Sequence, residues 1–136
     1  MEPTQDNEQL ENSNLFLKIL EQGDENEILS SIANTPNLLN EVISSENMTP
    51  FEILLNHGYE NTAKKLIDLP AFYLNEAEHN PLRACIKQGF IELADLLLDK
   101  NANPNSYLSN SPSILWLALE NNLFELADKI IEKVQR

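Results

Sequence analysis

Residues 80–105 read NPLRACIKQGFIELADLLLDKNANPN, a segment that contains two short amphipathic patterns separated by a glycine. In the first pattern, over residues 81–88, Leu82 and Ile86 are four residues apart. In the second, over residues 91–99, Leu93 and Leu97 have the same spacing. Apolar residues three and four apart lie on one face of an α-helix, so the segment predicts a helix, a turn and a second helix.

The same pattern recurs along the chain at nearly even intervals. One copy starts at Thr49, the next at Asn80 and another at Ser113, while a more divergent copy starts near Asn14. The fourth copy predicts helices at residues 114–119 and 124–134. A left-handed residue is expected to end the first helix of each copy, and in chain order it is Gly23, Gly58, Gly89 or Asn122. Short helix pairs are marginal alone, so stacking of several copies is expected.

At these residues the chain resembles the ankyrin repeat family, whose pattern is Thr-Pro-Leu-His-x-Ala, then a Gly between two antiparallel helices and an Asn in the next turn. The turn asparagine recurs as Asn40, Asn75 and Asn105. The resemblance implies an all-α helix-turn-helix solenoid with about four stacked helix pairs and short finger loops. It covers one domain, residues 14–136, with units at 14–48, 49–79, 80–112 and 113–136, after an acidic, flexible tail over residues 1–13.

Residues suited to catalysis or metal binding are few. His57 and His79 are too few for a histidine-rich metal site, and Cys85, the only cysteine, cannot form a Cys-x-x-Cys pair. The chain has no glycine-rich phosphate loop, nucleophile elbow or paired-histidine helix. We therefore expect a protein that is not an enzyme and that holds no cofactor and no metal, with Cys85 as a small core residue.

The net charge restricts the partners. With 22 acidic and 9 basic residues, the formal charge is -13. Nucleic acids and anionic membranes bind through Lys and Arg clusters, so neither is an expected partner. The chain has no signal-peptide pattern and no apolar run of the ~20 residues that cross a bilayer. A cytoplasmic location, or delivery into a host cell by a route without a signal peptide, is expected.

The resemblance implies that a partner protein binds the concave surface formed by the finger loops and first helices, as in an adaptor, a regulator or an inhibitor. A bacterial effector or effector regulator is one setting that fits. Glu52, Arg83 and Trp116 replace the family histidine. Aromatic residues dominate interface energies, so Tyr107, Leu108 and Trp116 are the expected anchors. The full expected set is Glu52, Asn56, His57, Glu76, Glu78, Arg83, Lys87, Gln88, Tyr107, Leu108, Trp116 and Glu120.

Two alternatives remain at this point. The acidic charge also suits a mimic that blocks the nucleic-acid or phosphate-binding groove of a basic protein. In addition, the segment Ile114–Leu119 is almost wholly apolar. Unless the helix at 124–134 caps the last unit, its apolar surface favours a homodimer or a covering partner. Packing of Trp116 inside the last unit is the alternative to a contact role.

Overall fold

The computed structural model describes residues 5–43, 46–75, 78–105 and 111–134, with side chains described from residue 14 onward. All regular structure in these residues is helical, which confirms the all-α prediction. The chain divides into two compact units, residues 1–72 and 73–136. We describe each unit separately.

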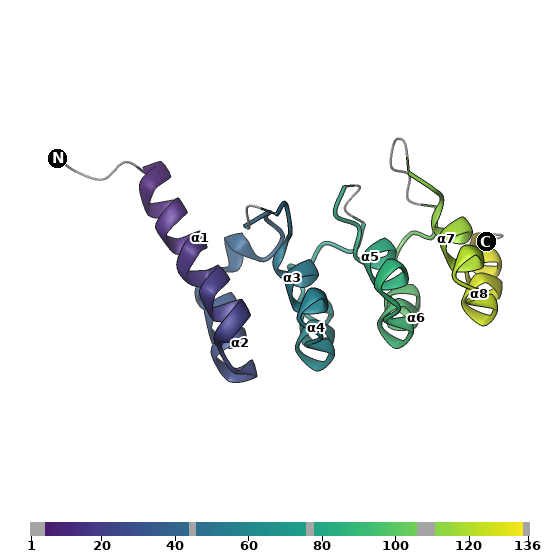
Figure 1. Cartoon of the computed structure of the whole chain (residues 1–136), viewed down its shortest axis with the longest axis horizontal. Coiled ribbons are helices and arrows are strands. Elements are labelled where there is room, and N and C mark those ends of the chain that lie inside the picture. The colour runs from purple at the N-terminus through teal and green to yellow at the C-terminus, as the bar shows by residue number, and fades with distance from the viewer. Residues whose placement is uncertain (1–4, 44–45, 76–77, 106–110, 135–136) are drawn as a thin grey trace. The chain divides into compact units, whose positions relative to one another are not determined.

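Unit 1 is built from two helix pairs (Figure 1). It contains α1 (Gln5–Gln22), α2 (Glu25–Asn34), the 3-10 helix η1 (Pro36–Leu38), α3 (Pro50–Asn56) and α4 (Glu60–Ile67). α1 packs against α2 and α3, and α2 packs against α4. Leu20, Leu54 and Leu66 are fully buried between these helices and form the centre of the unit's core.

Unit 2 repeats this arrangement of two helix pairs. It contains α5 (Pro81–Gln88), α6 (Ile91–Asp99), α7 (Ile114–Glu120) and α8 (Phe124–Val134). α5 pairs with α6 and α7 with α8, and across the two pairs α5 packs against α7 and α6 against α8. The predicted helices at 81–88, 91–99 and 124–134 are confirmed at both ends, and the one at 114–119 is one residue longer. Cys85 is buried, as expected of a small core residue.

The residues that start the last three copies are helix N-caps, whereas Asn14, near the start of the divergent copy, lies inside α1. The side chains of Thr49, Asn80 and Ser113 each accept a hydrogen bond from the backbone N–H three residues later, at 3.4, 3.0 and 3.0 Å. Pro50 and Pro81 occupy the first helical position, where the missing N–H has no cost. N-cap residue types recur at these positions because their side chains satisfy backbone donors that the helix leaves unpaired.

Three of the four expected left-handed residues are confirmed. Gly58, Gly89 and Asn122 have φ of 76°, 83° and 61°. The prediction for Gly23 was wrong, since its φ is not positive. Its N–H donates to the Ile19 carbonyl at 2.7 Å and continues the α1 ladder, so the helix needs no left-handed residue there.

The start of the chain also differs from expectation. α1 begins at Gln5, so residues 5–13 of the expected flexible tail belong to a helix of 18 residues. Leu10 is the one apolar residue of segment 5–13, so no apolar periodicity distinguishes it from a solvated tail in the sequence. The helix becomes recognisable in the sequence only where Phe16 and Leu20, both buried, give it an apolar face.

The turn asparagines connect consecutive turns within each unit. In unit 1, Asn40 Nδ2 donates to the Ala71 carbonyl at 2.7 Å. In unit 2, the Asn75 side-chain oxygen accepts from the Asn103 N–H at 2.7 Å. In the third turn, Asn103 accepts from the N–H of Asn105, the asparagine that the sequence singled out. The side chains of Asn40 and Asn75 thus hold neighbouring turns together, whereas Asn105 uses its backbone N–H within its own turn.

Candidate functional site

Two of the expected partner residues lie at the exposed end of α3. Asn56 is the last residue of that helix and His57 is its C-cap, and both are exposed. The His57 ring stacks on Tyr59 with centroids 5.6 Å apart and an interplanar angle of 21°. This contact holds the imidazole in a defined orientation at the surface of unit 1.

Glu52 has a local role in the same helix. It is half-buried, and its Oε1 accepts hydrogen bonds from the Thr49 N–H at 3.0 Å and the Thr49 hydroxyl at 3.1 Å. Together with the Thr49 side chain it forms a capping box. Glu52 therefore stabilises the start of α3.

Arg83 does not lie at the surface. Only 4% of it is exposed, and Nη1 donates to the Ser111 hydroxyl at 3.2 Å and to the Pro112 carbonyl. Desolvation by burial lowers the pKa of its guanidinium. An outward contact with a partner does not fit this position, because the side chain is used to hold the segment that leads into α7.

The other described residues of the expected set in unit 2 are exposed. Lys87 and Gln88 end α5, and Glu120 ends the neighbouring helix α7. Lys87 and Glu120 are equivalent positions of consecutive copies, so they give the ends of two packed helices opposite charges. Glu78 is also exposed. Three further expected residues lie outside the described residues, and they are Glu76, Tyr107 and Leu108.

Of the three expected anchors, Trp116 is the one that lies within the described residues. It is 58% exposed, although Arg83, the equivalent residue of the preceding copy, is 4% exposed. Its backbone N–H donates to the Ser113 hydroxyl at 3.0 Å, which fixes it in the first turn of α7. Packing of the indole inside the last helix pair, the alternative to a contact role, is excluded by this exposure.

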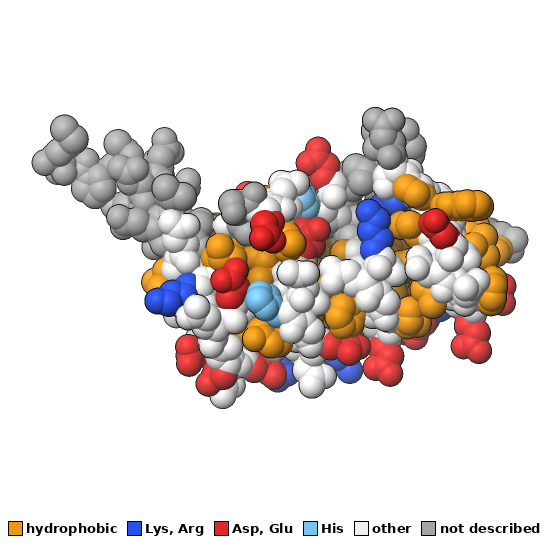
Figure 2. Space-filling view, viewed as in Figure 1, with side chains coloured by type: hydrophobic (Ala, Val, Ile, Leu, Met, Phe, Trp, Pro, Cys, Tyr) orange, Lys and Arg blue, Asp and Glu red, His pale blue; other side chains and the backbone are white. Residues whose placement is uncertain are grey.

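Exposed apolar side chains are concentrated on α7 and α8. Among the described residues, five of the eight large exposed hydrophobics belong to these two helices, and Figure 2 shows hydrophobic side chains gathered over them. Their exposed fractions lie between 38% and 60%. We call this set the α7–α8 apolar face, and it consists of Trp116, Leu119, Phe124, Ile131 and Val134.

Positions one repeat earlier show why this face is exposed. Ile86 and Leu98 are 1% and 0% exposed on α5 and α6, which pack against α7 and α8. Their equivalents in the next copy, Leu119 and Ile131, are 39% and 38% exposed. The same positions are therefore covered on one helix pair and open on the next.

The surroundings of the face are acidic. Glu120 lies four residues after Trp116, and Asp128 lies four residues after Phe124, so each carboxylate neighbours an aromatic residue of the face on the helix surface. Both acids are exposed. Three described lysines lie near these helices. Lys129 is engaged in two ion pairs that are described next, Lys133 precedes Val134 on α8, and Lys87 ends the neighbouring helix α5.

Lys129 of α8 bridges two carboxylates of α6. Its Nζ lies 2.6 Å from Asp95 Oδ1 and 2.6 Å from Asp99 Oδ1. These hydrogen bonds raise the pKa of Lys129, and the bond from Lys129 lowers the pKa of Asp99. The contact joins the two second helices of unit 2 and takes the cation away from the acidic edge of the face.

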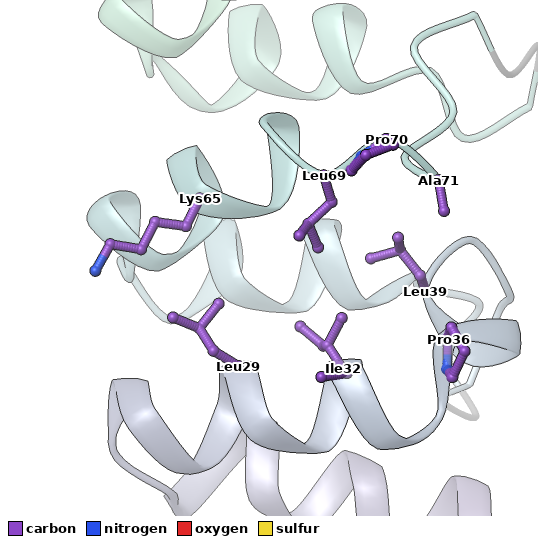
Figure 3. A pocket seen from close by; sticks show the side chains of 9 residues that line it. Leu29, Ile32, Pro36, Leu39, Lys65, Leu69, Pro70 and Ala71 are labelled. Atoms are coloured by element: carbon purple, nitrogen blue, oxygen red, sulfur yellow. The ribbon is translucent and has the colours of Figure 1, made fainter.

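Unit 1 contains an apolar groove that the sequence did not indicate. Its volume is about 370 Å³, and Figure 3 shows Leu29 and Ile32 of α2 directed toward Leu69 and Leu39. Lys65 borders the groove and forms an ion pair with Glu25. The lining is apolar apart from Lys65, so the groove suits an apolar group.

Across the described part of the chain, no three His, Cys, Asp or Glu side chains are grouped so that they could hold a metal ion. None of its helices has the length and apolar character that crossing a membrane requires. No protein-family model matches the chain, and no curated protein or solved structure matches it either.

Proposed function

We propose that the chain is an ankyrin-type repeat protein that acts by binding a partner protein, as an adaptor, regulator or inhibitor without catalytic activity of its own. The principal binding surface is the α7–α8 apolar face together with the exposed helix end at Glu120. The observation that carries the proposal is the exposure of Trp116, which is 58% against 4% at the equivalent Arg83.

An exposed tryptophan surrounded by other apolar side chains is suited to protein recognition. Tryptophan is among the residues most enriched at energetic centres of interfaces, and clustered exposed apolar residues mark binding surfaces. Leu119 and Phe124 are 39% and 60% exposed on the same helix pair. The helical spacing and the pattern of the repeats favour the ankyrin type, in which stacked helix pairs present their surfaces to other proteins.

Affinity capture with a matched variant tests the proposal. Purified protein and its Trp116→Ala and Tyr73→Ala variants are used to capture proteins from cell lysate at ~0.15 and ~0.5 M salt, which differ clearly in screening. Tyr73 is 59% exposed, so it matches Trp116 in exposure and aromatic character. We expect a specific partner at both salts and at least ~10-fold weaker retention by Trp116→Ala alone, which is the size of an interface hot spot. Equal retention by all three proteins would contradict the proposal.

The net charge of -13 supports a second function, the acidic mimic of a polyanion. Such a mimic would bind basic proteins mainly by charge, so its affinity would fall steeply between the two salt concentrations. Capture at ~0.15 M only, with no effect of Trp116→Ala, is the result expected of the mimic.

A further inference from the structure

We propose that the partner of the α7–α8 apolar face presents a basic amphipathic helix, with an apolar stripe flanked by Lys or Arg. This inference rests on the proposed function and specifies the chemistry of the partner at the same surface.

The internal packing of unit 2 indicates why the occupant is a helix. Ile86 and Leu98 are buried at 1% and 0% where one helix pair packs against the next. Leu119 and Ile131 hold the equivalent positions on α7 and α8 at 39% and 38% exposure. Leu119 and Ile131 of the α7–α8 apolar face therefore hold the positions at which α5 and α6 receive helices in this same unit. Helices pack by placing the side-chain ridges of one into the grooves of another, so a further helix fits the spacing.

The charges around the face select a basic helix. Glu120 and Asp128 are exposed and each lies one helical turn from an aromatic residue of the face, at Trp116 and Phe124. Lys129 leaves Asp128 unneutralised, because it is bound to Asp95 and Asp99 of α6. Lys87 ends α5, which packs against α7, so it offsets part of the charge of Glu120 and makes Asp128 the stronger acidic contact. Lys or Arg beside the apolar stripe of a partner helix would meet these carboxylates, and a cation over the indole would add a favourable cation–π contact.

A second copy of the chain fits the face less well. It would bring the same carboxylates and another charge of -13 to the interface. Like charges oppose association, whereas a basic partner would be attracted toward the surface. The two occupants respond oppositely to salt, since screening strengthens association of the acidic copies and weakens binding of a basic helix.

The test uses the full chain and the fluorescence of Trp116, its only tryptophan. The probe is a synthetic, tryptophan-free peptide with Leu at helical positions i, i+3, i+4 and i+7 and Lys on both flanks. One control peptide has the same composition in scrambled order, and another has Glu in place of Lys. We expect saturable binding of the basic helix with a blue shift of the emission, and at least ~10-fold weaker binding of both controls.

Two charge-adding variants separate the face from non-specific attraction. Ile131→Glu places a carboxylate within the face, and Val42→Glu adds the same charge in unit 1 at a residue of similar exposure, 42% against 38%. Non-specific charge attraction would strengthen binding of the basic peptide to both variants. We instead expect at least ~10-fold weaker binding to Ile131→Glu and little change for Val42→Glu, because apolar contacts of the face are lost only in the first. Circular dichroism verifies that both variants remain helical.

Several results would overturn the inference. Equal binding of the scrambled peptide, or binding to Ile131→Glu that is unchanged or stronger, would mean that apolar contacts of the face do not hold the probe. A dimer detected by light scattering that strengthens with salt and dissociates in Ile131→Glu would make a second copy the occupant. The proposed function would fail by a different result. In that case the lysate would yield no protein whose retention depends on Trp116.

Discussion

Arg83 of α5 donates a hydrogen bond from Nη1 to the hydroxyl of Ser111, 28 residues later, at 3.2 Å. The guanidinium also donates to the Pro112 carbonyl, and the side chain is buried. Arg83 thus fixes the approach to α7 from inside unit 2, and it does so at the position where the ankyrin pattern has histidine.

Replacement of Arg83 should destabilise unit 2. We expect Arg83→Met to lower the free energy of unfolding by about 1–3 kcal/mol, because Ser111 and Pro112 lose a charged donor. Arg83→Lys should recover only part of this loss, since an ammonium cannot reproduce the forked geometry of a guanidinium. Urea unfolding followed by circular dichroism gives the values. A variant Lys87→Met, exposed on the same helix, should be nearly neutral; similar losses at both positions would contradict the role of Arg83.

Two equivalent helix ends share a left-handed backbone conformation, and substitutions there should change stability in opposite directions. Gly89 has φ 83°, so Gly89→Ala should cost about 1–2 kcal/mol even though an added Cβ would meet nothing within 4 Å. Asn122, at φ 61°, fills the same position in the fourth copy. Asn122→Gly should be neutral or slightly stabilising, because glycine adopts this conformation without steric cost. Thermal unfolding of the two variants measures both effects, and destabilisation by Asn122→Gly would count against the shared backbone requirement.

The equivalent pair Leu98 and Ile131 tests the openness of the α7–α8 apolar face. Leu98 is 0% exposed and Ile131 is 38% exposed. Leu98→Ala should lower the free energy of unfolding by about 2–5 kcal/mol, as expected for a core cavity. Ile131→Ala should cost less than about 1 kcal/mol, since much of its side chain is already in water. Equal losses in urea unfolding would mean that the face is covered in solution.

The ion pairs of Lys129 with Asp95 and Asp99 predict how the free energy of unfolding depends on pH. The pKa of Asp99 is lowered in the folded chain, so its contribution to stability is present above about pH 4 and is lost as pH falls through the folded value. The pKa of Lys129 is raised, so its contribution is present below about pH 10 and is lost as pH rises through the folded value. The stability difference between the wild type and Lys129→Met should therefore be constant near neutrality and shrink as the pH falls below about 4.

Urea unfolding across pH measures this difference. Lys133→Met is the control, because Lys133 acts on Asp99 through charge without a hydrogen bond in the described contacts. If the stability difference between the wild type and Lys129→Met grew as the pH fell, the stabilising role of these ion pairs would be contradicted. Because the pairs are near the surface, added salt should also reduce the difference at neutral pH.

The helices of unit 2 could be predicted from sequence because several local signals coincide there. Asn80 and Ser113 are N-caps, Gly89 supplies the left-handed end, and the apolar residues between them have helical spacing. α1 lacked such signals at its start. Leu10 is the one apolar residue between Gln5 and Ser13, so no apolar stripe in the sequence separates this part of the helix from a solvated tail.

The candidate site was predictable only in part. Arg83 and Trp116 occupy the same place in the repeat, and the sequence cannot show that one is covered by the following segment while the other is exposed. Glu52 was placed among partner residues, although its hydrogen bonds to Thr49 form a capping box that the Thr-x-x-Glu spacing could have indicated. The groove in unit 1 combines residues from 29 to 71, whose proximity depends on tertiary packing.

Among the described helices, α7 and α8 are covered by a helix pair on one side only, and this affects which helices of unit 2 unfold locally first. α5 and α6 are covered by the next helix pair, whereas the outer positions Leu119 and Ile131 are partly in water. Local opening requires least energy where fewest apolar contacts are broken, so amide hydrogens of α8 should exchange with solvent before those of α6. A partner that covers the face would oppose this opening, since binding stabilises only the closed form. Recognition would then slow exchange along the whole of α8, including backbone amides that the partner never touches.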